Sequence, residues 1–320
     1  MNQIRIKTPS RLHFGLLGLG EPAPRRFGGL GLMIEDPGLE LSVESAENWS
    51  AHGPLSERAL TVARSVAERL ELIGKQVQPQ SIRIRHAPRL HTGLGVGTQL
   101  SLAIAHALGV FAGIRKPSAL QLAELSGRGD RSGIGIHGFA QGGLIVDAGR
   151  LREQVPTRVL RVDFPQEWSI LVVTPEEHVG IHGKAEAEAF LQLPPIPEIR
   201  ADQLCKLVLL RLLPAVVEGD LAEFGHALTS IQEKVGLSFA DAQGGAYASS
   251  HAEKIIIWLR GKGLAGVGQS SWGPTLYGFS EASLIDRLAL RAEIVSTFNI
   301  PNSRVIWTKA MNRGAKMLCE

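Results

Sequence analysis

A glycine-rich segment from Pro88 to Gln99 is the feature that most constrains the fold of this 320-residue chain. It follows a run in which Ile82 and Ile84 alternate with arginines, as in a strand, and it precedes apolar residues at helical spacing. Three glycines at such a junction let the backbone turn tightly, and the first amides of a helix attract anions. The sequence therefore predicts a phosphate-binding turn between a strand and a buried helix.

The glycine spacing separates this turn from two common nucleotide-binding loops. It lacks the Gly-Lys-Ser/Thr of a P-loop, and its glycines follow Gly-x-Gly-x-Gly rather than Gly-x-Gly-x-x-Gly. We expect its amides and two side-chain donors to hold phosphate or pyrophosphate. The residues concerned are Gly93, Gly95, Gly97, Thr98 and Gln99. His91 precedes them and is a candidate catalytic residue. The alternative is a turn that binds nothing.

A second glycine-dense segment spans residues 127–135. Arg128 and Arg131 in this segment are suited to clamp a phosphate or carboxylate through paired hydrogen bonds, which makes both candidate catalytic residues. Asp130 is also a candidate catalytic residue because it offers the oxygen ligand that Mg²⁺ prefers, and Ser132 adds a hydroxyl for substrate. The alternative is a solvated surface loop in which Asp130 pairs with a neighbouring arginine.

A third turn joins two short strand-like runs near the C-terminus. Gln269, Ser270 and Ser271 give it amides and hydroxyls, so we expect it to line the wall of the site opposite the glycine turn. Near the N-terminus, His13 is a candidate binder, acid or base because Arg11 adjoins it and Arg26 follows in a basic loop. The alternative for His13 is a structural histidine at a strand end.

Composition excludes several classes of protein. A content of 44% hydrophobic and 20% charged residues allows a large buried core, and a net charge of +3 is too small for a dedicated nucleic-acid binder but suits small anionic substrates. No apolar run approaches the roughly 18 residues of a membrane helix, and the first residues do not form a signal peptide. Cys205 and Cys319 are too isolated to indicate zinc. We expect a cytoplasmic protein.

The order of predicted elements indicates an α+β protein of two domains. Ile4 and Ile6 belong to a first strand, which Pro9 is expected to end. The second half alternates as strand, helices, two strands, helix and strand, which is the ferredoxin-like order. We place the boundary near residue 160, giving an N-terminal domain over 1–160 and a C-terminal domain over 161–320.

The three turns, in this order, resemble the GHMP kinase superfamily, which includes galactokinase, homoserine kinase and mevalonate kinase. The segments that carry the resemblance are Thr8–His13, Pro88–Gly97 and Gly266–Gly273. The resemblance covers nearly the whole chain. It implies an N-terminal α+β domain with a left-handed βαβ crossover, followed by a ferredoxin-like domain. The expected kinase loop ends in Gly-Leu-Gly-Ser-Ser, whereas here Val96 and Gly97 replace the serines that serve metal and ATP.

These departures resemble a non-kinase branch, the β-ribofuranosylaminobenzene 5′-phosphate synthases. The shared patterns are Gly-Leu-Gly-x-Gly-Thr-Gln, Gly-Arg-Gly-x-Arg-Ser-Gly-Ile-Gly and Ser-Ser-x-Gly-Pro-Thr. The resemblance implies a decarboxylating phosphoribosyltransferase of tetrahydromethanopterin biosynthesis. Such an enzyme joins phosphoribosyl pyrophosphate to 4-aminobenzoate or 4-hydroxybenzoate and releases CO₂ and pyrophosphate. It further implies a homodimer. For this reaction we expect Mg²⁺, with Asp130 as the candidate ligand, and from the composition we expect no nucleic-acid or membrane partner.

Within that resemblance, Arg11, His13 and Arg26 are expected to complete the aromatic-acid site. Two other functions stay open at this point. One is an ATP-dependent small-molecule kinase, against which the missing serine pair counts. The other is a non-catalytic binding protein on the same fold, against which the polar side chains of the three turns count. Binding without turnover distinguishes the second of these from an enzyme.

Overall fold

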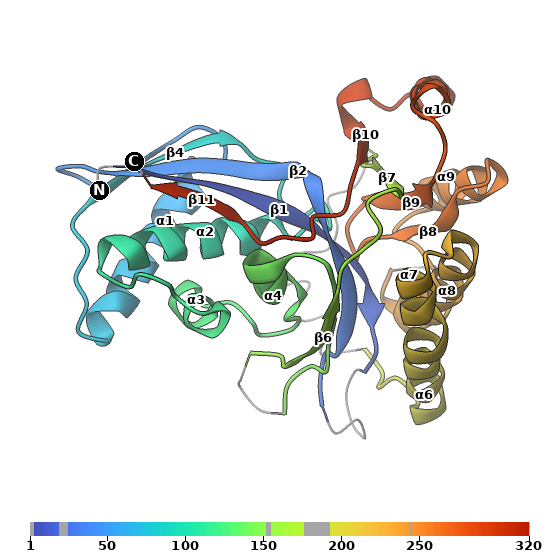
Figure 1. Ribbon diagram of the computed structural model, residues 1–320, viewed down its shortest axis with the longest axis horizontal. Helices are drawn as coiled ribbons and strands as arrows, with labels where there is room; N and C mark the ends of the chain where they lie inside the picture. Colours follow the sequence, from blue (N-terminus) through green and yellow to red (C-terminus); the bar gives the residue numbers. More distant parts are fainter. Residues whose placement is uncertain (1–2, 19–24, 152–154, 176–192, 244, 320) are drawn as a thin grey trace.

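The computed structural model describes residues 3–18, 25–151, 155–175, 193–243 and 245–319. Within these residues two sheets lie side by side, each with helices on one face (Figure 1). The larger sheet has the strand order β11-β1-β2-β4-β3, with β5 paired to β2 and β6 paired to β5. Its strands are β1 (Gln3–Leu16), β2 (Gly29–Ser45), β3 (Ser50–His52), β4 (Gln80–His86), β5 (Leu144–Asp147), β6 (Arg158–Val162) and β11 (Lys316–Cys319).

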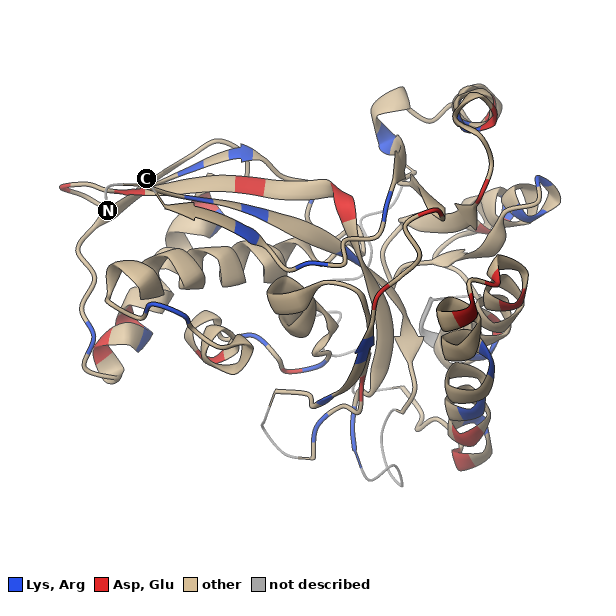
Figure 2. Ribbon diagram, viewed as in Figure 1, with Lys and Arg blue, Asp and Glu red and all other residues tan. Residues whose placement is uncertain are grey.

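Four helices cover one face of the larger sheet. They are α1 (Ser56–Leu72), α2 (Val96–Phe111), α3 (Ala119–Ser126) and α4 (Ile134–Gln141). Helix α1 connects β3 to β4, which are parallel neighbours, so these elements form a βαβ unit. Helix α2 carries no charged residue (Figure 2), and most of its side chains are buried. The prediction of a buried helix directly after the glycine turn is therefore confirmed.

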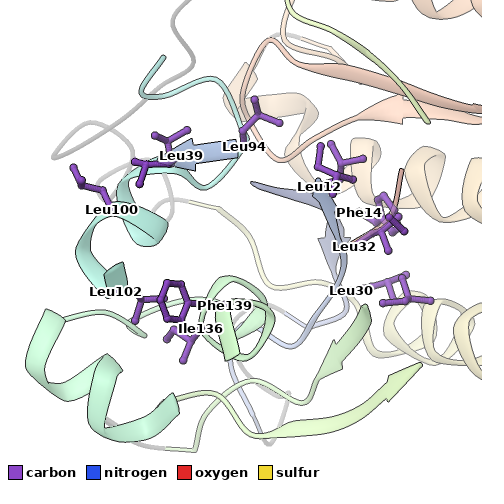
Figure 3. Close-up of a cluster of buried hydrophobic side chains, with 14 of the residues drawn as sticks. Leu12, Phe14, Leu30, Leu32, Leu39, Leu94, Leu100, Leu102, Ile136 and Phe139 are labelled. Carbon is purple, nitrogen blue, oxygen red and sulfur yellow. The ribbon is translucent and has the colours of Figure 1, made fainter. Parts of the chain in front are cut away.

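The apolar core forms where this helical layer meets the sheet. Figure 3 shows Leu102 of α2 beside Ile136 and Phe139 of α4, while Leu12 and Leu32 extend from the two central strands. Each of these side chains is at least 97% removed from solvent. Burying such side chains contributes about 1.5–3 kcal/mol each, so the core fixes the positions of both ends of α2 and α4.

Strand β1 continues past Pro9, and the expectation that this proline ends the strand is wrong. The register with β2 shifts between Thr8 and Ser10, so Pro9 occupies an irregular position where the ladder requires no amide donor. The strand consequently reaches Leu16 and carries Arg11 and His13 into the middle of the molecule.

The smaller sheet has the order β10-β7-β9-β8, and all its pairings are antiparallel. Its strands are β7 (Ser169–Val173), β8 (Ala265–Gln269), β9 (Leu276–Ser280) and β10 (Val305–Thr308). The helices of this half are α6 (Glu198–Leu207), α7 (Leu213–Glu218), α8 (Leu221–Gln243), α9 (Ser250–Gly261) and α10 (Leu284–Phe298), with a π-helical turn at Val208–Leu212 and a 3₁₀ turn at Asn302–Arg304. The ferredoxin-like order is confirmed. The boundary at residue 160 falls inside β6, and β11 returns to pair with β1, so that boundary stays a prediction.

Helix α8 joins the two halves. A Cβ atom placed on Gly15 would lie 2.5 Å from Val235, which shows that α8 packs directly on the backbone of β1. Gln232 of α8 donates to the carbonyl of Phe14 at 2.5 Å and accepts from the amide of Gln269 at 3.0 Å. One buried amide side chain therefore ties the end of β1 to the end of β8.

Candidate active site

Three segments that are distant in the sequence meet at Ser270. Its hydroxyl donates to the carbonyl of Gly93 at 2.7 Å and accepts from the amide of His13 at 3.0 Å. Ser270 is fully buried, so it joins β1, the glycine turn and the third turn from behind. The expectation that its side chain lines the site wall is corrected by this burial. Its neighbour Ser271 does line the cavity, and the Ser271 amide donates to the carbonyl of His13 at 3.1 Å.

Each glycine of the turn is required for a different structural reason. A Cβ atom on Gly93 would lie 2.3 Å from the carbonyl oxygen of Ser270, so the first glycine allows the two turns to cross. Gly95 is the N-cap of α2 in the left-handed region, and the Arg11 side chain packs against it. Neither glycine lines the cavity, and both place the start of α2 rather than the ligand.

Two guanidinium groups converge on the first turn of α2. The Arg128 side chain donates to the carbonyl of Gly97 at 3.2 Å and to the hydroxyl of Ser101 at 3.1 Å. A Cβ atom on Gly97 would lie 3.3 Å from the Arg58 guanidinium and 3.5 Å from that of Arg128. Within the described part of the chain, the buried Nε of Arg58 has no hydrogen-bond partner. Burial and then the charge of Arg58 lower the pKa of Arg128, so this end of the site attracts an anion.

A cavity between the two halves, here called the central cavity, has a polar and an apolar part. The polar part is lined by Arg11, His13, Thr98, Arg128, Asp130, Arg131 and Ser132. The apolar part is lined by Phe14, Leu16, Val235, Phe239, Tyr247 and Trp272. Trp272 is held against Phe239 with an edge-to-face geometry and 5.5 Å between ring centroids. A ligand with anionic and aromatic groups matches this lining.

His13 connects the polar part of the cavity to a buried carboxylate. Its Nδ1 accepts from the Gly15 amide at 3.2 Å, so the ring proton lies on Nε2, which is 3.2 Å from the Ser132 hydroxyl. Ser132 donates in turn to Oδ2 of Asp147 at 3.3 Å. Burial, followed by the charges of Arg11 and Arg131, lowers the pKa of His13 well below its usual value, so the imidazole is neutral.

Asp147 is fully buried at the end of β5. It accepts hydrogen bonds from the amides of Gly133 and Gly149, both at 2.9 Å. Burial raises its pKa to about 6, although these hydrogen bonds and the one from Ser132 oppose the rise. The carboxylate thus holds the second glycine-dense segment against β5 and lies directly behind Ser132.

The raised pKa of Asp147 predicts that stability falls as the pH rises. The folded chain binds the proton more tightly than the unfolded chain, so this contribution is complete below the ordinary pKa of 3.8 and is lost as the pH passes about 6. Relative to Asp147→Asn, the wild type should lose about 2 kcal/mol of unfolding free energy between pH 4 and 7. Urea unfolding at several pH values measures this difference, and parallel curves for the two proteins would contradict it.

Four predicted site residues lie elsewhere or act differently. His91 is half-buried with a left-handed backbone and does not line the central cavity, and Arg26 is exposed, with its backbone bridged to Arg150. Gln99 is buried and donates to the carbonyl of Gly135 at 2.9 Å, tying α2 to α4. The Gln269 side chain lines the cavity but also holds the amide of Ala248 at 2.8 Å. The first two placements argue against direct roles in the site.

Three residues of the site were missed in the sequence. None of them belongs to a glycine-rich turn. Gln232 of α8 lines the central cavity, Arg58 of α1 lies close to Gly97, and Asp147 of β5 accepts a hydrogen bond from Ser132. The one available signal concerned Asp147, because a carboxylate directly after an apolar strand and before a glycine-containing turn is unusual in a core.

Relatives of known name match the chain over almost its full length. A β-ribofuranosylphenol 5′-phosphate synthase of Methanothermobacter thermautotrophicus is 32% identical over 336 residues, covering 99% of each chain. The enzyme of the same name from Archaeoglobus fulgidus is 34% identical over 339 residues, covering 98% of this chain and 99% of the relative. The chain belongs to this synthase family. The resemblance drawn from the three turns is confirmed, and the chain is an enzyme of the glycosyltransferase class.

The synthase fold is that of the GHMP kinases. The GHMP kinase C-terminal family model matches residues 212–294. A phosphomevalonate kinase of Streptococcus pneumoniae superposes with a TM-score of 0.70 at 14% identity, covering 97% of this chain and all of the kinase. A homoserine kinase of Listeria monocytogenes gives 0.67 at 17%, covering 99% and 100%. Identities this low show the fold alone. No helix in the described residues is long and apolar enough to cross a membrane.

Proposed function

We propose that this synthase transfers the phosphoribosyl group of phosphoribosyl pyrophosphate to 4-hydroxybenzoate or 4-aminobenzoate, with release of CO₂ and pyrophosphate. The observation that carries the proposal is the central cavity, whose lining combines arginine side chains near the start of α2 with an aromatic wall. The relatives are named for a phenol product, which favours 4-hydroxybenzoate as the acceptor.

The basic end supplies what departure of pyrophosphate requires. Negative charge develops on the leaving oxygen as the bond to the ribose carbon breaks, and fixed positive groups stabilise that charge. Arg128 is already oriented by Gly97 and Ser101, so it needs little rearrangement to bind the diphosphate. Arg58 approaches the same turn from α1 and adds a second charge. The glycine turn also favours binding of the diphosphate, because it leads into the N-terminus of α2, whose amides attract an anion.

The apolar end serves the attacking ring. Phe239 and Trp272 offer flat surfaces against which a benzoate ring stacks, and Arg11 and Arg131 in the same cavity suit the anionic groups of the substrates. The ring carbon that bears the carboxylate attacks the ribose carbon, and loss of CO₂ then restores the aromatic ring. This apolar wall excludes water, which would otherwise hydrolyse the activated sugar.

The donor set fits Mg²⁺ only together with its substrate. The described residues contain no group of three His, Cys, Asp or Glu side chains suited to a metal ion, and the Asp130 side chain is 87% exposed, 4.0 Å from Arg150. Mg²⁺ commonly uses one or two carboxylates plus phosphate oxygens and water. We therefore assign Asp130 as a single carboxylate beside a diphosphate-bound ion, which would supply further charge neutralisation.

Three finer points belong to the same proposal. We place the reaction in tetrahydromethanopterin biosynthesis and the assembly as a homodimer, because the family resemblance implies both. A cytoplasmic location is the expectation from the sequence composition. Light scattering after size-exclusion chromatography measures the assembly directly. A monomer at assay concentrations would remove the homodimer from the proposal.

A decarboxylation assay tests the proposed reaction. Purified chain, Mg²⁺ and phosphoribosyl pyrophosphate are mixed with either acid labelled in its carboxyl group, and labelled CO₂ and pyrophosphate are measured. We expect equal amounts of the two products. Folded protein that releases no CO₂ above the blank would refute the proposal. Thermal stabilisation by ATP, with none by phosphoribosyl pyrophosphate, would favour a kinase, and stabilisation without turnover would favour a binding protein.

Replacing Arg131 with alanine should lower kcat/KM about 30- to 100-fold. Arg131 lines the cavity, and losing a charge-assisted hydrogen bond to a substrate anion costs about 2–3 kcal/mol. The matched control is Arg115→Ala, at an exposed position beyond α2. Unchanged kinetics of Arg131→Ala in the same assay would remove this arginine from the site.

A further inference from the structure

Two hydrogen bonds connect His13 to Ser132 and Ser132 to Asp147. This series begins at the central cavity and ends in the protein interior. His13 and Ser132 line the cavity, whereas Asp147 lies behind them and is fully buried. Its hydrogen-bond donors are backbone amides and the Ser132 hydroxyl. A purely structural carboxylate would need no connection to the cavity, so the hydroxyl between them suggests a path for a proton.

Two of the bonds at Ser132 are long. His13 Nε2 and the Ile134 amide both lie 3.2 Å from the Ser132 oxygen, near the upper limit for such bonds. A ligand hydroxyl can therefore replace the bond from His13 at small cost. Placed between the two residues, it would accept the Nε2 proton of His13 and donate its own proton to Ser132, leaving every donor and acceptor satisfied.

The proposed reaction makes different demands for its two acceptors. Attack by the ring carbon leaves positive charge that is shared by the substituent on the para carbon. On 4-hydroxybenzoate this substituent is a hydroxyl group, which becomes strongly acidic and must lose its proton. On 4-aminobenzoate the charge rests on nitrogen as an iminium ion, which is stable without a base. A base near the para position is thus needed for the hydroxy acid alone.

We propose that the acceptor's para-hydroxyl binds between His13 and Ser132, and that Ser132 relays its proton to Asp147; this inference rests on the proposed function. As the ring carbon bonds to the ribose carbon and the bond to pyrophosphate breaks, the phenolic proton moves to Ser132, whose own proton moves to Asp147. When the bond to CO₂ breaks, its electron pair restores the aromatic ring. The proton then returns along the same path to the phenolate oxygen, so no outside acid or base is consumed.

The ionisation of Asp147 supports this role. Burial raises its pKa to about 6, so the group is ionised at neutral pH yet binds a proton more readily than an ordinary carboxylate. A general base of this strength is suited to a proton that becomes acidic only in the transition state.

The test compares acceptors in Ser132→Ala. We expect kcat/KM for 4-hydroxybenzoate to fall about 100-fold or more, and that for 4-aminobenzoate, which loses only a binding contact with Ser132, to fall by no more than about 10-fold. A third acceptor, 3,5-difluoro-4-hydroxybenzoate, has a more acidic phenol, and the assay is run at a pH at which this phenol is ionised. Its loss of activity in the variant should match that of 4-aminobenzoate and be smaller than that of 4-hydroxybenzoate. Asp147→Asn is the second variant and should give the same pattern.

Ser126→Ala is the matched control, because Ser126 is buried outside the cavity and, among the described residues, its hydroxyl donates to the carbonyl of Ala123. An equal loss with every acceptor would assign Ser132 and Asp147 to structure and overturn the inference, as would unchanged kinetics in Ser132→Ala. If the wild type uses only hydroxy acids, the fluorinated acceptor decides between the same two results. A wild type that releases no CO₂ from any acceptor would instead refute the proposed function itself.

Discussion

Arg128→Met should reduce kcat/KM for phosphoribosyl pyrophosphate about 10²- to 10³-fold. The guanidinium lies at the N-terminus of α2, oriented by the Gly97 carbonyl and the Ser101 hydroxyl. Removing one fixed donor that stabilises developing negative charge costs about 2.7–4 kcal/mol in comparable sites. Methionine keeps most of the buried alkyl length, so the loss should appear in catalysis more than in folding. Steady-state kinetics with labelled acceptor, together with a thermal melt, measures both.

Arg58→Met and Arg64→Met complete the comparison on a single helix. Arg58 reaches the first turn of α2, whereas Arg64 is exposed further along α1. We expect a loss of about 10- to 100-fold for Arg58→Met and none for Arg64→Met. Equal behaviour of the two α1 variants, or an Arg128→Met enzyme within about threefold of wild type, would mean that the diphosphate binds elsewhere.

Local sequence signals predicted those cavity residues that lie in turns, because the residue types of a turn indicate its backbone structure directly. The alternation at Ile82 and Ile84 and the glycines that follow specify a strand, a turn and a helix through backbone preferences alone. The same applies to the second glycine-dense segment, whose Arg128, Arg131 and Ser132 all reach the central cavity. Such signals work because the interacting atoms are close in sequence.

The remaining parts of the site depend on packing between segments that are distant in sequence. Arg58 belongs to an ordinary amphipathic helix, and only the contact between α1 and α2 brings it to Gly97. Asp147 gains its properties from burial behind Ser132, which no local pattern encodes. Ser270 was expected at the cavity because its turn is polar, yet its hydroxyl is used to join three backbones.

The backbone at Pro9 and Gly93 also depends on contacts between segments that are distant in the sequence. A proline favours a strand end in isolation, but the register shift between β1 and β2 accommodates Pro9 inside a long strand. The glycine of the turn was assigned to phosphate, whereas its closest requirement is the carbonyl of Ser270. Tertiary contacts thus decided both positions.

Gly93→Ala should destabilise the fold by about 2–6 kcal/mol and reduce activity in the folded fraction. Gly93 has φ +85° and its Cβ atom would lie 2.3 Å from the Ser270 carbonyl oxygen and 3.2 Å from Cα of Gly273. Left-handed strain costs about 1–3 kcal/mol, and a backbone clash adds about 1–3 kcal/mol as the turns move apart. That movement also displaces the start of α2, where we propose that pyrophosphate binds.

Gly74→Ala separates the two costs. Gly74 has a similar φ of +70°, but a Cβ atom there would meet nothing within 4 Å. We therefore expect a loss of about 1 kcal/mol, from backbone strain alone. Urea unfolding of both variants measures the difference, and kinetics on the folded fraction measures displacement of the helix. Equal destabilisation by the two substitutions would show that the glycine turn does not pack on the third turn, because only that contact distinguishes the two positions.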